Sequence, residues 1–188
     1  MKRLTRTATA VAAGLLLLGT LGTATATAAT ATAATATAAT GTSGTATAPG
    51  GVLGPDGYKG IQLGQSERDA EKTGLLVNKQ TTPGCDFYRL AASEGKPNLG
   101  GGVFIEPRKG VVVITGTNLI RTPEGITMGT GLARVKAAYP RLTKVGDFIF
   151  ETPVPGGTPG ERYRFAVDEQ NLVADFALEA TDRGTCDS

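Results

Sequence analysis

The residues best suited to chemistry in this 188-residue chain are its two cysteines, Cys85 and Cys186. In a chain that leaves the cytoplasm, an even number of thiols with no second metal-binding residue type beside them favours one disulfide bond. Two unrelated thiols are the alternative. Because the sequence holds no histidine and only these two cysteines, it cannot assemble the four nitrogen or sulfur ligands of a structural zinc site.

Carboxylates are the remaining candidates for acid-base chemistry, since a nucleophile activated by histidine is excluded. Glu67, Asp69 and Glu71 lie close together, and we interpret them as the solvated face of a short helix instead of a glycosidase pair. The run Gly100-Gly101-Gly102 lacks the Gly-Lys-Ser/Thr ending of a phosphate-binding loop, so we interpret it as a flexible connector. The sequence therefore predicts no catalytic, cofactor or metal site, and a protein that is not an enzyme.

The first 28 residues have the features of a cleavable secretion signal. Three basic residues within the first six positions precede the apolar run 14–19, and small residues of the Ala-x-Ala kind follow between positions 23 and 29. The apolar run is far shorter than the roughly 18 residues of a membrane span. We therefore expect a secreted mature chain, extracellular or in the cell wall, with no membrane span.

Residues 29–51 are expected to form a disordered spacer. From Ala24 to Ala38 the chain repeats Ala-Thr-Ala-Thr-Ala three times, and similar sequence continues to Gly51. A segment without aromatic or large aliphatic side chains cannot bury enough apolar surface to offset the entropy lost on ordering. The spacer is either a tether for the folded part or a repeat expansion beside the signal.

The charge of the mature chain is close to balanced. Removing the three basic residues of the signal leaves 16 Lys and Arg against 17 Asp and Glu. Binding of nucleic acid or an anionic membrane requires clustered basic residues. Neither is therefore an expected partner.

Residues 52–188 are expected to form one domain of two similar halves, about 58–120 and 121–188. The turn Gly60-Ile61-Gln62-Leu63-Gly64 recurs 65 positions later as Gly125-Ile126-Thr127-Met128-Gly129, and a short helix is expected after each. Ser66 and Gly74 are placed to begin and end the first helix, and Pro140 forbids continuation of the second. Both turns precede helix starts and could bind an anion, although repeated turn geometry explains them equally well.

Strand-like segments follow each expected helix, and each half ends in a hairpin. The expected strands are 85–90, 103–106 and 111–115 in the first half, and 146–151, 162–167 and 172–178 in the second. Pairing Val167 with Leu172 places Tyr163 opposite Phe176, Phe165 opposite Ala174, and Arg164 opposite Asp175. That register gathers apolar side chains on one face and opposite charges on the other.

The first hairpin is expected to be apolar on both faces, with Phe104, Val111 and Val113 on the face away from the helices. Helices on one side leave that second face available to a partner, a loop or another subunit. We therefore predict a binding face centred on these three residues. Tyr88 and Arg89 are further expected contributors.

The doubled turn, helix and three-strand pattern resembles the tandem repeats of the β-lactamase inhibitor protein family and the half-units of small outer-membrane assembly lipoproteins. The chain also resembles a group of uncharacterised secreted proteins of actinobacteria, which share the Gly-Ile-x-Leu-Gly start and the junction at residues 121–126. The resemblance implies an α+β fold: a tandem repeat of helix plus three to four antiparallel strands, forming one two-layer sheet with helices on one face. In the inhibitor family, a curved sheet presents a concave, aromatic-rich face to an enzyme. Those inhibitors carry two cysteines per repeat and several tryptophans, so only the fold is carried over.

The leading functional hypothesis is a secreted, non-enzymatic binding or protein-interaction module, a class that includes inhibitor-like proteins. Its partner would be an extracellular protein or a cell-wall component, and no cofactor is expected. The first alternative is a structural cell-envelope protein or homodimer that buries the same face against itself. A hydrolase of an unrecognised type is the second alternative.

Overall fold

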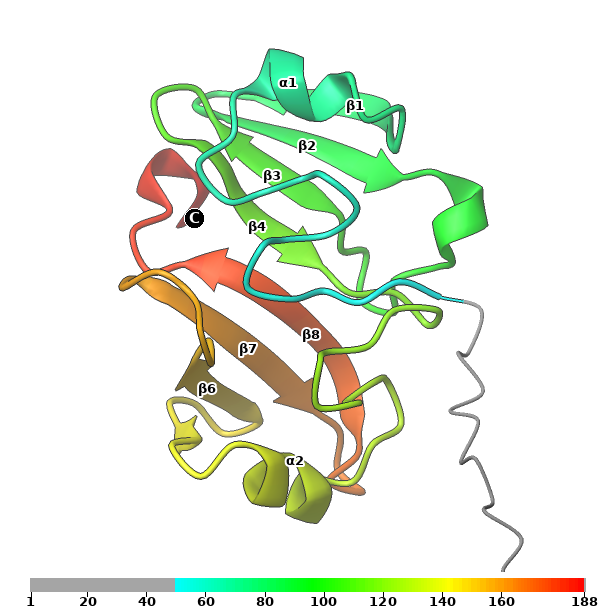
Figure 1. Cartoon of the computed structure of the whole chain (residues 1–188), viewed down its shortest axis with the longest axis vertical. Helices are drawn as coiled ribbons and strands as arrows, with labels where there is room; N and C mark the ends of the chain where they lie inside the picture. Colours follow the sequence, from blue (N-terminus) through cyan, green and yellow to red (C-terminus); the bar gives the residue numbers. More distant parts are fainter. Residues whose placement is uncertain (1–49, 188) are drawn as a thin grey trace, which may run out of the picture. The chain divides into compact units, whose positions relative to one another are not determined.

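One antiparallel sheet of eight strands dominates the computed structural model, which describes residues 50–187 (Figure 1). The strand order is β1-β2-β3-β4-β8-β7-β6-β5. The strands are β1 (Leu76–Thr82), β2 (Cys85–Leu90), β3 (Val103–Glu106), β4 (Gly110–Thr115), β5 (Thr143–Lys144), β6 (Ile149–Pro153), β7 (Glu161–Val167) and β8 (Val173–Ala180). The helices are α1 (Glu67–Glu71), α2 (Leu132–Ala138) and the 3-10 helices η1 (Ala92–Glu94) and η2 (Gly184–Asp187). The fold is thus mostly β with two short α-helices, where an α+β fold was expected.

The predicted signal peptide and residues 29–49 of the predicted spacer lie outside the described residues. Residues 50 and 51 are described, and the backbone carbonyl of Gly51 accepts the Arg121 N–H at 3.2 Å. The next residues continue this contact: Val52 forms a parallel bridge with Arg121, and the Leu53 N–H donates to the Arg121 carbonyl at 2.9 Å. In the described part of the chain, no helix is long and apolar enough to cross a membrane.

The two α-helices begin and end where the sequence signals predict. The hydroxyl of Ser66 accepts the Asp69 N–H at the start of α1, and Gly74 has a left-handed φ of 71° after its end. In α2, Leu132 and Val135 are buried, and the helix stops before Pro140. Helices of five and seven residues are unstable alone, so packing on the sheet must supply their stability.

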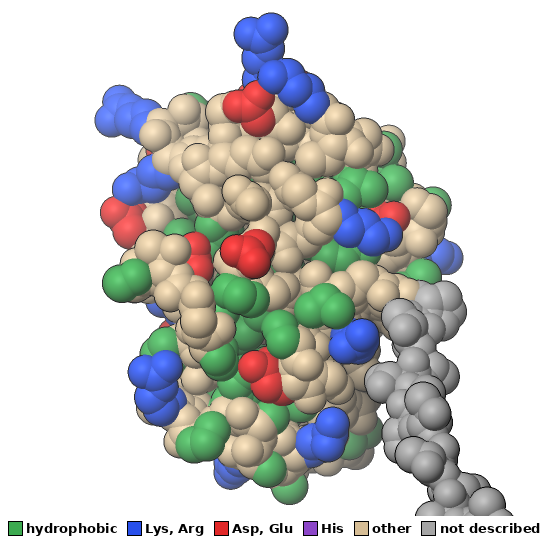
Figure 2. Space-filling view, in the orientation of Figure 1, with side chains coloured by type: hydrophobic (Ala, Val, Ile, Leu, Met, Phe, Trp, Pro, Cys, Tyr) green, Lys and Arg blue, Asp and Glu red, His purple; other side chains and the backbone are tan. Residues whose placement is uncertain are grey.

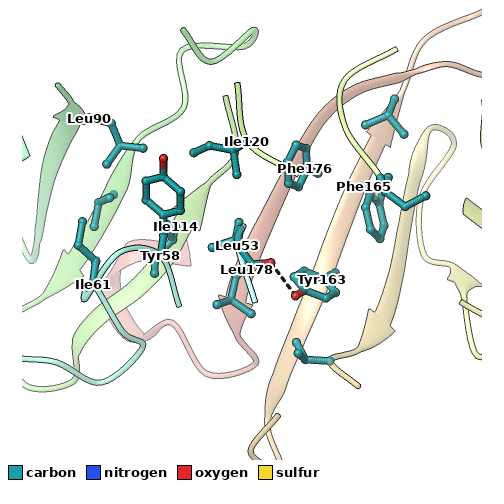
Figure 3. Close-up of a cluster of buried hydrophobic side chains, with 14 of the residues drawn as sticks. Leu53, Tyr58, Ile61, Leu90, Ile114, Ile120, Tyr163, Phe165, Phe176 and Leu178 are labelled. Atoms are coloured by element: carbon teal, nitrogen blue, oxygen red, sulfur yellow. Dashed lines mark hydrogen bonds between the residues drawn. The ribbon is translucent and has the colours of Figure 1, made fainter. Parts of the chain in front are cut away.

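The main core lies between the sheet and a layer that contains both helices and two long segments, residues 50–64 and 116–131. In Figure 1, the first of these, residues 50–64, crosses in front of β3 and β4. It contributes Leu53, Tyr58 and Ile61, which are fully buried. Figure 3 shows these side chains packed with residues of the strands, and the Tyr163 hydroxyl donating to the Leu53 carbonyl at 2.8 Å. Basic and acidic side chains are interspersed over this side of the molecule (Figure 2).

The two Gly-Ile turns dock on the sheet through the same backbone hydrogen bonds. Residues 64–65 exchange two bonds with Val111, of 2.8 and 2.9 Å, and residues 129–130 exchange two with Val173, also of 2.8 and 2.9 Å. Val111 and Val173 lie at the starts of β4 and β8, which pair with each other at the middle of the sheet. Each turn therefore places the start of its following helix near the last strand of its half.

The predicted register of the second hairpin is wrong. Val167 pairs with Val173, where Leu172 was expected. The carboxylate of Asp168 accepts the backbone N–H groups of both Gln170 and Leu172, at 3.0 and 2.8 Å, which keeps Leu172 inside the turn. A register shift next to Val167 moves the following pairs by one more residue.

The composition of the two faces of this hairpin survives the shift, because the total displacement from the predicted register is two residues along most of the hairpin. Tyr163 pairs with Leu178 on the core side, while Arg164 pairs with Ala177 on the other side. Arg164 still reaches Asp175, as a diagonal neighbour. Alternation therefore predicted the faces correctly even though it did not predict the partners.

A second bulge places Val111 on the opposite face of the sheet from the one predicted. In the β3–β4 pair, Phe104 lies opposite Val113 but Ile105 lies opposite Val111, so Val112 is the additional residue. Val111 consequently points into the main core and is fully buried, and Val112 takes its place on the other side. Tyr88 also points into the main core, where its hydroxyl donates to Glu67 and Glu71 of α1.

Candidate functional site

The side of the sheet away from α1 and α2, which we call the open face, carries a second apolar cluster. Val112, Val113 and Ala177 form this cluster, with Phe104 packed against it. Its members come from β3, β4 and β8, at the middle of the sheet. The open face thus has its own small apolar centre, separate from the main core.

Three of the five residues predicted to form a binding face belong to the open face. Phe104 is half-buried and its ring lies 5.0 Å from that of Phe87 on β2. Arg89 is exposed, with its guanidinium 5.9 Å from the centre of the Phe87 ring. Val113 is only 5% exposed, so it lies beneath the surface of this face. Val111 and Tyr88 are the two that lie on the opposite, core side.

The C-terminal segment forms one wall over the open face. The disulfide between Cys85 and Cys186 fastens η2 to β2, with the two Cα atoms 5.1 Å apart, which confirms the predicted pairing. The Thr185 hydroxyl also donates to the Gly84 carbonyl. Because β3 and β4 lie between β2 and β8, the segment after β8 must cross β4 and β3 to reach its disulfide partner.

The glycine run forms a second wall and is not simply a connector. The Asn98 side-chain amide donates to the Ala174 carbonyl at 3.0 Å, which draws this segment over β8. Gly101 then passes so close to β4 that an added Cβ would lie 2.3 Å from the Thr115 side chain. Only glycine permits that approach of backbone to sheet.

Between these two walls is a hollow of about 310 Å³, which we call the open-face pocket. Phe104, Val113 and Thr115 of the sheet line it, together with Leu99 of the glycine-run segment. Arg164, Asp175, Glu179 and Arg183 add charged groups to its lining. A hollow of this size is at the small end of the range for ligand sites, and its lining combines apolar and charged side chains.

Glu179 is the centre of the charged network beside the pocket. It is 1% exposed, and its carboxylate receives the Arg164 Nε at 2.7 Å. The guanidinium groups of Arg162 and Arg183 approach the same carboxylate at 3.5 and 3.4 Å. A buried carboxylate requires such compensation, because removing its charge from water is costly. The contacts with Glu179 and Asp175 hold the pKa of Arg164 above its usual value even though burial opposes this.

Asp175 is less completely compensated than Glu179. Its Oδ2 accepts a hydrogen bond from Arg164 at 3.2 Å, but its buried Oδ1 has no hydrogen-bond partner among the described residues. The residue is 3% exposed. Burial raises the pKa of this carboxyl, and the neighbouring Arg164 and the Phe176 backbone N–H only partly oppose the rise.

The spacing of charged residues in the sequence indicated this network, but the predicted binding face did not include it. Arg162 and Arg164 are two residues apart, as are Asp175, Ala177 and Glu179. Charged side chains at this spacing share one face of a strand. The prediction paired Arg164 with Asp175 but did not place that pair beside Phe104, because the order of the strands in the sheet was unknown.

Other candidates from the sequence have structural partners. Glu67 and Glu71 accept the Tyr88 hydroxyl, and Asp69 pairs with Lys72 and the Ser66 cap. In the two turns considered as anion sites, the N–H groups of Gly64 and Gly129 donate to backbone carbonyls of the sheet. Among the described residues, no group of three or more Cys, Asp or Glu side chains is arranged to hold a metal ion.

Comparisons with protein-family models, with curated proteins and with solved structures find no match to this chain.

Proposed function

We propose that this chain is a secreted, non-enzymatic binding module that contacts a protein partner through its open face. The observation that carries the proposal is the half-buried Phe87–Phe104 pair beside the open-face pocket. Aromatic residues and arginine are enriched where protein surfaces meet, and the strongest contacts cluster around pockets. Arg89 provides an exposed arginine next to the aromatic pair.

Secretion is supported by the disulfide and by the N-terminal sequence. A bond between residues 101 positions apart persists in an oxidising compartment, and thiols in the cytoplasm are normally kept reduced. The basic and apolar segments at the start of the chain match an export signal. These two features together support an extracellular or cell-wall location.

We further propose that the two halves are copies of one structural unit, as in the tandem repeats that the sequence resembles. The equal docking of residues 64–65 and 129–130 on β4 and β8 supports this duplication. Each half also has the order helix and four strands. A duplicated unit that joins at β4 and β8 makes a wide, continuous face, which suits a protein partner.

The proposal is tested by capturing partners from culture supernatant and cell-wall extract with the full chain and two charge-reversal variants. Arg89→Glu alters the open face, and Arg68→Glu makes the same change on exposed α1. We expect Arg89→Glu to weaken capture about tenfold, the effect of losing one good interface contact. Arg68→Glu should leave capture unchanged.

Equal capture by both variants, or loss only with Arg68→Glu, would contradict an open-face interface. Light scattering on the same samples tests self-association. A dimer of the wild-type chain that dissociates in Arg89→Glu would replace the foreign partner with a second copy of this chain. Circular dichroism of each variant confirms that the comparison is between folded proteins.

A further inference from the structure

We propose that the open-face pocket receives a basic side chain of the partner, with Asp175 as the acceptor for its ammonium or guanidinium group. This inference rests on the proposed function, because it specifies which chemical group of the partner protein enters the pocket. It concerns the pocket itself, whereas the proposed function concerns the wider face around Phe104 and Arg89.

The incomplete hydrogen bonding of Asp175 is the first argument. Arg164 holds Oδ2 at 3.2 Å, while the buried Oδ1 lacks a donor in the described part of the chain. Buried acceptors in folded proteins almost always have a donor, because an unpaired one loses its hydration without compensation. A donor supplied by a ligand would complete the coordination of this carboxylate.

The distribution of charge in the network is the second argument. Glu179 is approached by three guanidinium groups, whereas the described ion pairs of Asp175 come from Arg164 alone. Positive charge is therefore concentrated at the Glu179 end, and the Asp175 end is the less neutralised. Burial raises the pKa of Asp175 and the Glu179 carboxylate adds to the rise, while Arg164 and the Phe176 backbone N–H oppose it only in part. A cation at this end would stabilise its ionised form.

The shape of the pocket is the third argument. Its lining includes Phe104 and Val113 beside Asp175, and its volume of about 310 Å³ is suited to one long side chain. Lysine and arginine have an apolar stem and a charged head, so the stem can pack on apolar surface while the head reaches a polar group. An aromatic ring beneath a cation adds further attraction.

The wall made by residues 99–100 can admit the ligand. Asp175 Oδ1 lies beneath the molecular surface, so an entering group must displace part of a wall to reach it. Leu99 is 67% exposed, and there is open space within 4 Å of where a Cβ on Gly100 would lie. Leu99 and Gly100 lie between two residues that contact the sheet, Asn98 and Gly101, whereas η2 on the other side is held by the disulfide.

The test is a titration of the isotope-labelled full chain by nuclear magnetic resonance with four small probes of similar length. Butylammonium and butylguanidinium carry the proposed groups, and butyrate and butanol are the anionic and neutral controls. We expect saturable millimolar binding of the two cations, with shifts at Leu99, Gly101, Thr115 and Asp175. Butyrate and butanol should give no saturable shifts at these positions.

Asp175→Asn keeps the shape of the side chain and removes its charge, so it should weaken cation binding at least fivefold. Asp147→Asn makes the same change at an exposed position and should have no effect. Unchanged cation binding by Asp175→Asn would overturn the assignment of the acceptor. The wild-type titration needs no variant: binding of butyrate in place of the cations, or of none of the probes, would overturn the proposal.

These outcomes separate the inference from the proposed function. Loss of partner capture in Arg89→Glu without cation binding in the pocket would retain the open-face interface and reject the basic anchor. Cation binding without any effect of Arg89→Glu on capture would retain the pocket chemistry and reject the interface.

Discussion

Removing the disulfide should strongly destabilise the folded protein. The bond joins residues 101 positions apart, Cys85 in β2 and Cys186 in η2. In the chain-entropy model, a cross-link over a loop of this length lowers the entropy of the unfolded chain by an amount equivalent to about 4.7 kcal/mol at 25 °C. Replacing both cysteines with serine should therefore reduce the free energy of unfolding by about 4 to 5 kcal/mol.

The assay is paired urea and thermal unfolding of the wild-type chain and the double serine variant. For a folded unit of this size, the expected loss corresponds to a decrease in Tm of about 15 °C. Reduced wild-type protein provides an independent comparison, since its two cysteines both belong to the bridge and a reductant has no other disulfide to break. The reduced protein and the serine variant should agree.

A loss of less than about 1 kcal/mol in both samples would refute the reasoning, because it would mean that the unfolded chain gains little freedom when the bridge is absent. Hydrogen exchange identifies the cause of such a result. Fraying confined to η2, with the global free energy of unfolding unchanged, would show that the bridge only fastens the C-terminal segment.

Two further predictions concern buried carboxylates. Glu179→Gln should reduce the free energy of unfolding by about 2 to 4 kcal/mol, because three partly buried arginines lose their shared counter-charge. In urea unfolding, Glu169→Gln on an exposed turn should change it by less than about 0.5 kcal/mol. The second prediction is acid sensitivity at Glu94, whose pKa is lowered first by the Lys59 ammonium and then by the Tyr58 hydroxyl. Its contribution is complete above its unfolded pKa of 4.5 and is lost as the pH falls through the lower folded value. Urea unfolding between pH 3 and pH 7 should therefore show a smaller acid loss in Glu94→Gln, and an unchanged acid loss would contradict this assignment.

The strands and helices with a clear local sequence pattern were predicted correctly. The bounds of β2 and β3 match the expected strands, and Ser66 begins α1 as its cap. β1 was missed because it is an edge strand whose residues from Asn78 on are exposed, so no alternation of apolar and polar residues marks it. A register shift beyond Val77 further interrupts its pattern.

The candidate site was only partly predictable, for two physical reasons. A bulge in β4 exchanges the faces of Val111 and Val112, and bulges depend on pairing that the sequence does not display. The pocket also depends on which strands are neighbours. The pairing of β4 with β8 brings Val113 beside Glu179, two residues from different halves of the chain.

The parallel contact at the start of the described chain determines how the protein would respond to force. Val52 and Leu53 lie along Arg121, and the Leu53 carbonyl is held by the Tyr163 hydroxyl of β7. A pull through residue 50 would stretch this segment along its length and load its hydrogen bonds in shear, so that they share the load. A molecule held from its N-terminal side would thus transmit tension into the centre of the sheet, without first peeling away either edge strand.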